Sequence, residues 1–523
     1  MTAPFDHSDD SVVVVIGTGA GGGTLANELA QKGVSVVALE AGGRHLPDDY
    51  INDEWESFGQ LAWLDKRTTS GGWRVSKDFA GLPAWIVKAV GGSTTHWAGA
   101  SLRFQEHEWK AASTYGGVPG ASLLDWPIDA AEMDPWYAKA EAKMRVTRTN
   151  GLPGLPGNNN FKVFEAGAKK LGYEDVHTGR MAINAVPGGD RAACQQLGFC
   201  FQGCKYGAKW STAYTEIPAG EATGNLEVRE HAHVLRIEHG DDGRVTGVVY
   251  AERDGTERRQ AARVVAVAGN SIESPRLLLN SASSMFPDGL ANSSGQVGRN
   301  YMRHMTGSVY AIFPEPVRMW RGTTMAGIIT DESRNDTSRG FVGGYEMETL
   351  SIGVPFMAAF LNPGAWGRAF TTAMDGYENM AGMWLVGEDM PQESNAITLH
   401  PNERDQFGLP VPNVNFTDHP NDVAMRNHAY AQGSAVYDAV GAVRTMPTPP
   451  YPSTHNLGTN RMSEKARDGV VNKWGQTHDI ANLFISDGSQ FTTGAAENPT
   501  LTIVALAIRQ AEEMAGMMSR GEI

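Results

Sequence analysis

The sequence predicts an α/β fold, in which a Rossmann-like dinucleotide-binding domain is joined to a second domain with a sheet of its own. One observation comes from the N-terminal region, where a Val/Ile-rich run over 11–16, a glycine-rich turn, a helical pattern over 24–32 and an apolar run over 34–39 form a βαβ unit. The other comes from residues 225–281, where alternating strands lead into a further buried strand and a helix.

The turn of the βαβ unit carries a phosphate-binding pattern. Gly17, Gly19 and Gly22 fit G-x-G-x-x-G between a strand and a helix, which lets the backbone approach a pyrophosphate at the positive end of the helix. Glu40 follows the second strand, where an acid binds the hydroxyls of the adenosine ribose. The pattern predicts a dinucleotide, and by itself it does not decide between FAD and NAD.

Composition and charge narrow the class of protein. Apolar residues make up 41% of the chain and charged residues 20%, as in ordinary globular enzymes. The net charge of -15 counts against nucleic-acid partners, which need clustered Lys and Arg. No apolar run is long enough to predict a membrane span. The acidic N-terminus is unlike a signal peptide, which taken alone predicts a cytoplasmic protein.

A second glycine pair precedes a histidine. Gly91 and Gly92 are followed by small polar residues and His96, which suits a loop that lies against a flat ring. A glycine turn beside a buried structural histidine explains the same residues equally well.

Two C-terminal segments carry the candidate catalytic residues. His455 can accept the proton of a hydroxyl group while a nearby amide, that of Asn498, orients the same hydroxyl. Pro499 suits the first turn of the final helix, whose positive end favours negative charge.

The three cysteines of the chain lie within eleven residues of one another, at Cys194, Cys200 and Cys204. Such clustering predicts a shared bond or ligand. Three thiolates suit zinc with a fourth ligand, a disulfide with one thiol left over, or an iron–sulfur cluster, and the spacing does not choose among these.

With these motifs together, the chain resembles the glucose-methanol-choline (GMC) oxidoreductase family over nearly its full length. Further segments that carry the resemblance are Trp126-Pro127-Ile128, Trp136-Tyr137, 264–279, Gly298-Arg299-Asn300 and 405–410. The resemblance implies FAD as the cofactor. It also implies a discontinuous FAD domain over 10–300 and 440–523, with a cysteine loop at 190–210, and a substrate domain over 305–440.

The resemblance also implies roles for single residues. His455 matches the catalytic base of the family, and Asn498 matches the second catalytic position. The expected FAD contacts are Gly17, Gly19, Gly22, Glu40, Gly91, Gly92, His96, Val234, Gly269, Asp487, Asn498, Pro499 and Thr500.

Within the family, the cysteine spacing is similar to that of the catalytic subunits of bacterial sugar and sugar-acid dehydrogenases. This similarity implies that Cys194, Cys200 and Cys204 hold a 3Fe-4S cluster that passes electrons to a cytochrome c. It also implies a small partner subunit that carries the export signal, and therefore a periplasmic location.

Residues 95–97 (Thr-His-Trp) are similar to pyranose oxidases, in which the histidine that matches His96 carries FAD covalently. The chain departs from that pattern at Ala98, so covalent attachment at His96 stays open. The two similarities together imply a sugar or glycoside substrate, oxidised at C1 as by a glucose dehydrogenase or at C3 as by a glucoside 3-dehydrogenase. The alternative is a pyranose-oxidase-like enzyme that reduces oxygen to peroxide. Residues 305–440 are expected to form short strands and turns, and they carry no motif that identifies the substrate.

Overall fold

The computed structural model describes residues 5–523 except 55, 57–61, 64–68, 71–84, 362–364 and 452. These exceptions fall within the predicted domain ranges 10–300, 305–440 and 440–523, and there the prediction lies outside the described residues.

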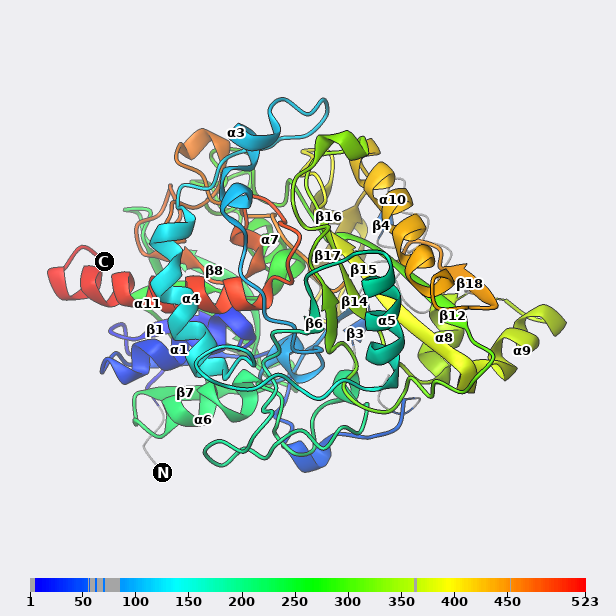
Figure 1. The fold of residues 1–523 in the computed structure, drawn as a ribbon. Coiled ribbons are helices and arrows are strands. Elements are labelled where there is room, and N and C mark those ends of the chain that lie inside the picture. The colour runs from blue at the N-terminus through cyan, green and yellow to red at the C-terminus, as the bar shows by residue number, and fades with distance from the viewer. Residues whose placement is uncertain are drawn as a thin grey trace.

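A parallel sheet of five strands forms the first half of the molecule, on the left in Figure 1. Its strand order is β19-β11-β1-β2-β7, and every neighbouring pair is parallel. The strands are β1 (Val13–Ile16), β2 (Val36–Leu39), β7 (Leu226–Arg229), β11 (Val264–Val267) and β19 (Leu483–Ile485). All four residues of β1 are buried, as their unbroken run of Val and Ile predicts for a strand covered on both faces. The Rossmann-like prediction is confirmed.

Helices from both ends of the chain pack beside this sheet. Helix α1 (Ala20–Gln31) contacts the C-terminal helix α11 (Thr500–Arg520), which in turn contacts α4 (Ala130–Met144). Next to them lies an antiparallel sheet of β8 (His233–His239), β9 (Val245–Ala251) and β10 (Glu257–Ala261), followed by α7 (Asn270–Asn280). The two chain ends therefore meet in one layer, although they are far apart in the sequence (Figure 1).

A second sheet of six antiparallel strands forms the other half of the molecule, on the right in Figure 1. Its order is β18-β12-β15-β14-β13-β6. The strands are β6 (Val176–Thr178), β12 (Met305–Ile312), β13 (Gly327–Ile329), β14 (Tyr345–Thr349), β15 (Met380–Gly387) and β18 (Arg444–Pro447). Helices α5 (Asn159–Lys170) and α10 (Pro420–Asp438) pack on it. Since β6 and β18 lie outside 305–440, this sheet takes strands from both sides of the predicted substrate domain, and the division at 305 and 440 stays a prediction.

The expectation of short strands and turns over 305–440 missed several longer elements. Strands β12 and β15 each have eight residues, and α10 has 19. Every residue of β15 is buried, so the strand shows no polar alternation. The buried stripe of α10 includes Asp422, Arg426 and Gly433, so an apolar period is not visible in its sequence.

The remaining elements complete the two halves. The short helices are α3 (Ala111–Tyr115), α6 (Glu216–Glu221), α8 (Val354–Leu361) and α9 (Arg368–Asp375). Two small sheets contain β3 (Ala62–Trp63) with β5 (Trp85–Ile86), and β16 (Ala396–Arg404) with β17 (Pro410–Asn415) and β4 (Thr69–Ser70).

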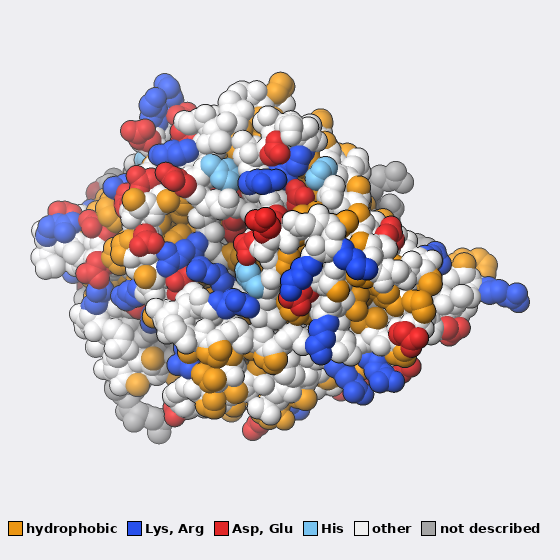
Figure 2. Space-filling model, viewed as in Figure 1, with side chains coloured by type: hydrophobic (Ala, Val, Ile, Leu, Met, Phe, Trp, Pro, Cys, Tyr) orange, Lys and Arg blue, Asp and Glu red, His pale blue; other side chains and the backbone are white. Residues whose placement is uncertain are grey.

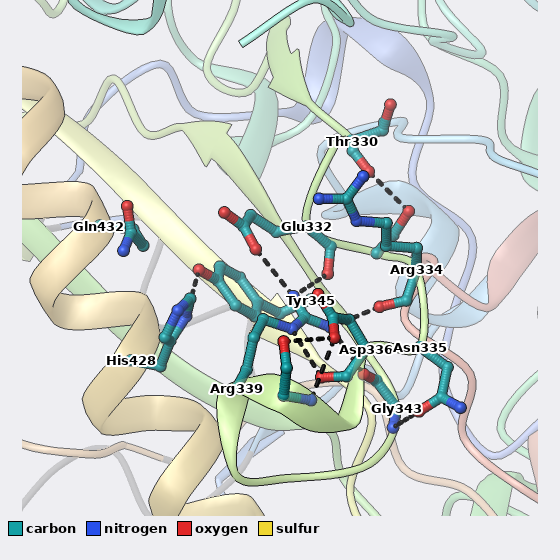
Figure 3. Close-up of polar contacts among 12 residues, drawn as sticks. Thr330, Glu332, Arg334, Asn335, Asp336, Arg339, Gly343, Tyr345, His428 and Gln432 are labelled. Carbon is teal, nitrogen blue, oxygen red and sulfur yellow. Dashed lines mark hydrogen bonds and ion pairs between the residues drawn. The ribbon is translucent and has the colours of Figure 1, made fainter. Parts of the chain in front are cut away.

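Polar contacts fix the connection between β13 and β14 (Figure 3). Arg339 donates to the Glu332 carboxylate at 2.7 Å and to the carbonyl of Gly343 at 3.0 Å. Tyr345 on β14 lies with its hydroxyl 2.9 Å from Nδ1 of His428 on α10. The Tyr345–His428 contact joins the start of β14 to α10. Leu350, directly after β14, lines the cavity described below.

On the face shown in Figure 2, Lys and Arg side chains are interspersed with Asp and Glu. Among the helices of the described residues, none combines the length and apolar character that a bilayer crossing requires.

Candidate active site

A cavity of about 330 Å³ begins at the carboxyl ends of β1, β2 and β11 and extends to the loop that carries His455. This edge of a parallel α/β sheet is where such folds bind their ligands. The predicted residues that line the cavity are Gly17, Gly19, Glu40, Gly92, His96, Val234, Gly269, His455, Asp487, Asn498, Pro499 and Thr500.

The three glycines of the first motif differ in the space around them. Gly17 has a φ of 95°, and a β-carbon there would lie 2.5 Å from the carbonyl oxygen of Ala268, so the turn requires glycine. Gly19 borders open space, where the nearest atom to an added β-carbon is Cα of Gly92 at 3.9 Å. Gly22 instead lies behind the cavity wall, because a β-carbon there would reach the Gly17 carbonyl oxygen at 2.1 Å. The motif thus leaves space at Gly19 and packs tightly at Gly17 and Gly22.

Glu40 connects the end of β2 with the glycine turn. Its Oε2 accepts hydrogen bonds from the backbone N–H of Thr18 at 3.1 Å and from the Thr18 hydroxyl at 2.8 Å. Its Oε1 accepts from the N–H of Gly42 at 3.0 Å. Burial raises the pKa of this carboxyl, and the three hydrogen bonds oppose the rise. A carboxylate oxygen can accept two hydrogen bonds, so Oε1 keeps capacity for a ribose hydroxyl.

The second glycine pair lies directly against the first motif. Gly91 has a φ of 96°, and a β-carbon there would lie 2.7 Å from Cβ of Ala213, which places Gly91 behind the wall. A β-carbon on Gly92 would come within 2.9 Å of Cα of Gly19. The two predicted glycine loops therefore meet across the floor of one cavity, and this geometry fits a cofactor that contacts both.

His96 is buried at the end of this loop. Its Nδ1 lies 2.7 Å from the carbonyl oxygen of Phe201, so Nδ1 carries the hydrogen and Nε2 keeps its lone pair. Burial lowers the pKa of His96 to about 4, which keeps the ring neutral at pH 7.

We expect acid precipitation of the protein to release its flavin, because Ala98 departs from the covalently linked pattern at His96. The measurement is the flavin absorbance of the supernatant and of the washed pellet. Flavin that stays with the pellet of the wild type but not with that of His96→Ala would contradict this expectation and identify His96 as the anchor.

Asp487 follows β19 and fixes the start of α7. Its Oδ2 accepts from the N–H of Asn270 at 2.9 Å and from the Ser274 hydroxyl at 2.5 Å, while Oδ1 accepts from the N–H of Ser489 at 2.8 Å. Burial raises its pKa. Gly269, the residue before α7, and Val234 on β8 line the same cavity.

His455 and Asn498 line the same cavity, although 43 positions separate them in the sequence. Nδ1 of His455 lies 3.1 Å from Nδ1 of His304, and the two rings meet edge to face with centroids 5.0 Å apart. Trp384 on β15 contacts the His455 ring at a centroid distance of 5.3 Å. Burial lowers the pKa of His455 well below its usual value, and the neighbouring His304 lowers it further.

Asn498 leads into the final helix. Its Oδ1 is buried and has no hydrogen-bond partner among the described residues, which leaves it for a bound molecule. Burial raises the pKa of Glu348 on β14 to about 8, a rise that the nearby Asn498 side chain partly opposes. Pro499 and Thr500 place the positive end of α11 at the cavity, where it favours negative charge on a bound group.

Sequence reasoning missed His304, Trp384 and Glu348 as neighbours of the predicted pair. They come from β12, β14 and β15 or from their ends, and no motif marks them. The single signal available in the sequence was that His304 follows closely on Gly298-Arg299-Asn300, one of the segments that carried the family resemblance.

The three cysteines surround a small cavity of about 40 Å³, and all three are free and half-buried. Burial raises the pKa of the Cys194 thiol to about 12. The donor types fit a metal cluster, but within the described part of the chain no three His, Cys, Asp or Glu side chains are arranged to hold a metal ion. The side chains as they lie therefore do not form a ready-made metal site, and the 3Fe-4S cluster stays a prediction.

The cysteine segment lies against the His96 loop. The buried ammonium group of Lys209 donates to the carbonyls of Thr95 at 3.1 Å, Trp97 at 2.6 Å and Cys200 at 2.6 Å. Burial lowers the pKa of Lys209 to about 8. One side chain thus joins the wall of the large cavity to the cysteine segment.

The class of protein follows from where the large cavity lies. The carboxyl edge of a Rossmann-like sheet binds a dinucleotide, and here that edge shares one cavity with His455 and Asn498, an arrangement suited to an oxidoreductase. Family models described as GMC oxidoreductase match residues 66–306 and 391–507. The chain belongs to the GMC oxidoreductase family, whose members bind FAD and act on CH–OH groups.

Three known proteins illustrate the similarity. The chain is 34% identical to 2-methyl-1,2-propanediol dehydrogenase of Mycolicibacterium austroafricanum, over 97% of this chain and 95% of the relative. It is 29% identical to the fructose dehydrogenase large subunit of Gluconobacter japonicus, over 97% of this chain and 98% of the relative. The solved structure of pyridoxine 4-oxidase from Mesorbium loti superimposes with a TM-score of 0.67 at 16% identity, covering 97% of this chain and 99% of that one, and so shares the fold.

Proposed function

We propose that this protein is an FAD-dependent dehydrogenase that oxidises a hydroxyl group of a sugar or glycoside, at C1 or C3 of a pyranose. The observation that carries the proposal is that one cavity is lined both by the glycine loops and by His455 and Asn498. A hydroxyl group held between this histidine and this amide lies beside the space that the cofactor takes.

In the proposed reaction, His455 accepts the proton of the substrate hydroxyl. The Asn498 side chain holds the hydroxyl oxygen and so fixes which carbon faces the cofactor. FAD, when bound, supplies the two-electron acceptor for the hydride that leaves this carbon. Because burial lowers the pKa of His455, the ring is neutral and ready to accept a proton at pH 7, and it releases that proton readily afterwards.

Two observations bear on the substrate class, and they favour different substrates. The name of the fructose dehydrogenase large subunit supports a sugar. The most identical of the three relatives described above acts on a small branched diol by its name, and apolar side chains of Met325, Leu350 and Trp384 line the cavity. A small aliphatic diol is therefore the second candidate substrate.

The test is anaerobic mixing of the holoprotein with a panel of alcohols, followed by the loss of flavin absorbance and by identification of the product. The panel contains glucose, methyl glucosides, fructose, gluconate and 2-methyl-1,2-propanediol. Bleaching by a sugar or glycoside with oxidation at C1 or C3 supports the first candidate. Bleaching by the diol alone replaces it with the second, and bleaching by none of them overturns the proposal.

For the electron route, we propose that Cys194, Cys200 and Cys204 hold a 3Fe-4S cluster that delivers electrons to a cytochrome c. Support comes from the three thiols around one cavity and from the contact of Lys209 with both segments. A small signal-bearing subunit and a periplasmic location belong to the same proposal, and the relative described as a large subunit supports a multi-subunit assembly. The side-chain arrangement alone does not form a metal site, so iron content decides the matter.

Purified holoprotein is expected to contain about three irons per chain, one for each thiolate ligand. Its EPR signal should be present in the oxidised state and disappear on one-electron reduction. Cys200→Ser should reduce electron delivery to cytochrome c much more than flavin reduction by substrate, whereas the exposed neighbour change Gln195→Ala should alter neither. Iron-free protein that produces peroxide from oxygen at its full rate would contradict the cluster and favour the pyranose-oxidase-like alternative.

A further inference from the structure

His304 occupies an unusual position between the two candidate catalytic segments. It immediately precedes β12, is 1% exposed, and has a φ of 61°, in the left-handed region that a residue with a side chain rarely adopts. Backbone conformations of this kind persist only where the surrounding structure holds the residue in place, and they cluster at active sites.

The His304 ring touches both segments. Its Nε2 lies 2.9 Å from the carbonyl oxygen of Gly494, four residues before Asn498, and its Nδ1 lies 3.1 Å from Nδ1 of His455. The approach to Gly494 is close, because a β-carbon at that position would come within 3.2 Å of the His304 ring. His304 itself does not line the large cavity.

These contacts determine where the ring hydrogens are. A carbonyl oxygen only accepts, so His304 must carry its hydrogen on Nε2 and donate it to Gly494. Burial lowers the pKa of His304 to about 4, so the ring is neutral and its Nδ1 has a lone pair. The hydrogen between the two rings therefore belongs to Nδ1 of His455, and Nε2 of His455 is left as an acceptor.

We propose that His304 is a positioning residue that holds His455 in the tautomer with hydrogen on Nδ1, so that Nε2 is always free to accept a proton. The Gly494 carbonyl sets the tautomer of His304, and His304 sets that of His455. The same hydrogen bond remains when His455 takes up a second proton, because Nδ1 still donates to His304. This inference rests on the proposed role of His455 as the base.

A direct test reads the tautomers without any substrate. In holoprotein labelled with ¹⁵N-histidine, the signals of His455 are assigned by their absence from the spectrum of His455→Ala. At pH 7 the expected pattern is a protonated Nδ1 and an unprotonated Nε2 for His455, and the reverse for His304. A His455 ring that carries its hydrogen on Nε2 would overturn the proposal.

Two substitutions of similar size test the consequence. His304→Asn keeps an acceptor atom at the δ position and suits a left-handed backbone, whereas His304→Leu removes the acceptor. With the alcohol that bleaches the flavin fastest in the panel above, His304→Leu should lower kcat by about 10–100-fold, the loss typical where the partner that orients a metal-binding histidine is removed. KM should change little, since His304 lies outside the cavity wall, and His304→Asn should restore most of kcat.

Flavin content of each variant reports whether the fold survives. If His304→Leu loses its flavin, the comparison is made with His304→Gly, which also fits the backbone and lacks an acceptor. Full kcat in an acceptor-free variant would overturn the inference, as would an equal loss in His304→Asn. Adding His304→Leu to His455→Ala should cause no further loss. Near-normal turnover of His455→Ala alone would instead refute the base assignment, so the two failures are distinguishable.

Discussion

His455→Ala is expected to lower turnover by about 10²–10⁴-fold, the usual contribution of a positioned general base. The loss should appear in the rate of anaerobic flavin reduction by substrate. Flavin content should stay normal, because the glycine loops and Glu40, which carry the predicted dinucleotide contacts, are unchanged. The control is His400→Ala, which alters a histidine outside the cavity wall.

The lowered pKa of His455 determines in which direction the activity changes with pH. Burial lowers the pKa of His455, so the base is neutral above that pKa and becomes protonated as the pH falls through it. Activity should therefore persist below pH 6.5, the ordinary histidine value, and decline only at lower pH. Near-normal turnover of His455→Ala across this range would place the base elsewhere.

Gly19→Val is expected to yield protein without flavin. The position borders open space between the two glycine loops, and a branched side chain there would fill the room in which a pyrophosphate approaches the backbone. The measurement is the ratio of flavin to protein absorbance after purification. Gly117→Val is the matched control, since that exposed glycine has no neighbouring atom within 4 Å of an added β-carbon. A Gly19→Val protein with its full yellow colour would refute this placement of the cofactor.

The sequence was sufficient to predict the parallel sheet and the glycine turn of the cofactor-binding half, because both depend on short stretches of neighbouring residues. A buried parallel strand shows itself as an apolar run, and the turn after β1 needs glycines for steric reasons that a motif records. The motif did not reveal that Gly22 and Gly91 pack behind the wall while Gly19 and Gly92 border the cavity, because this depends on which loops meet.

The rest of the site depends on contacts that have no local pattern. His304 and His455 are 151 positions apart and meet only because β12 passes beside the C-terminal loop. The helix α10 was missed because its buried stripe contains charged residues and a glycine. For the cysteines, close spacing in the sequence did not determine how the thiols point in space, and the metal prediction depended on that orientation.

The strand order of the parallel sheet has a consequence for biosynthesis. Strand β1 is made well before β19, yet both belong to the sheet at whose edge the cavity opens. At about 5–20 residues per second, the roughly 470 residues between them take on the order of 25–95 s to translate. Strand β11, which lies between β1 and β19 in the sheet, therefore stays unpaired on one side until β19 follows it about 215 residues later, and the edge that opens to the cavity is complete only from then on.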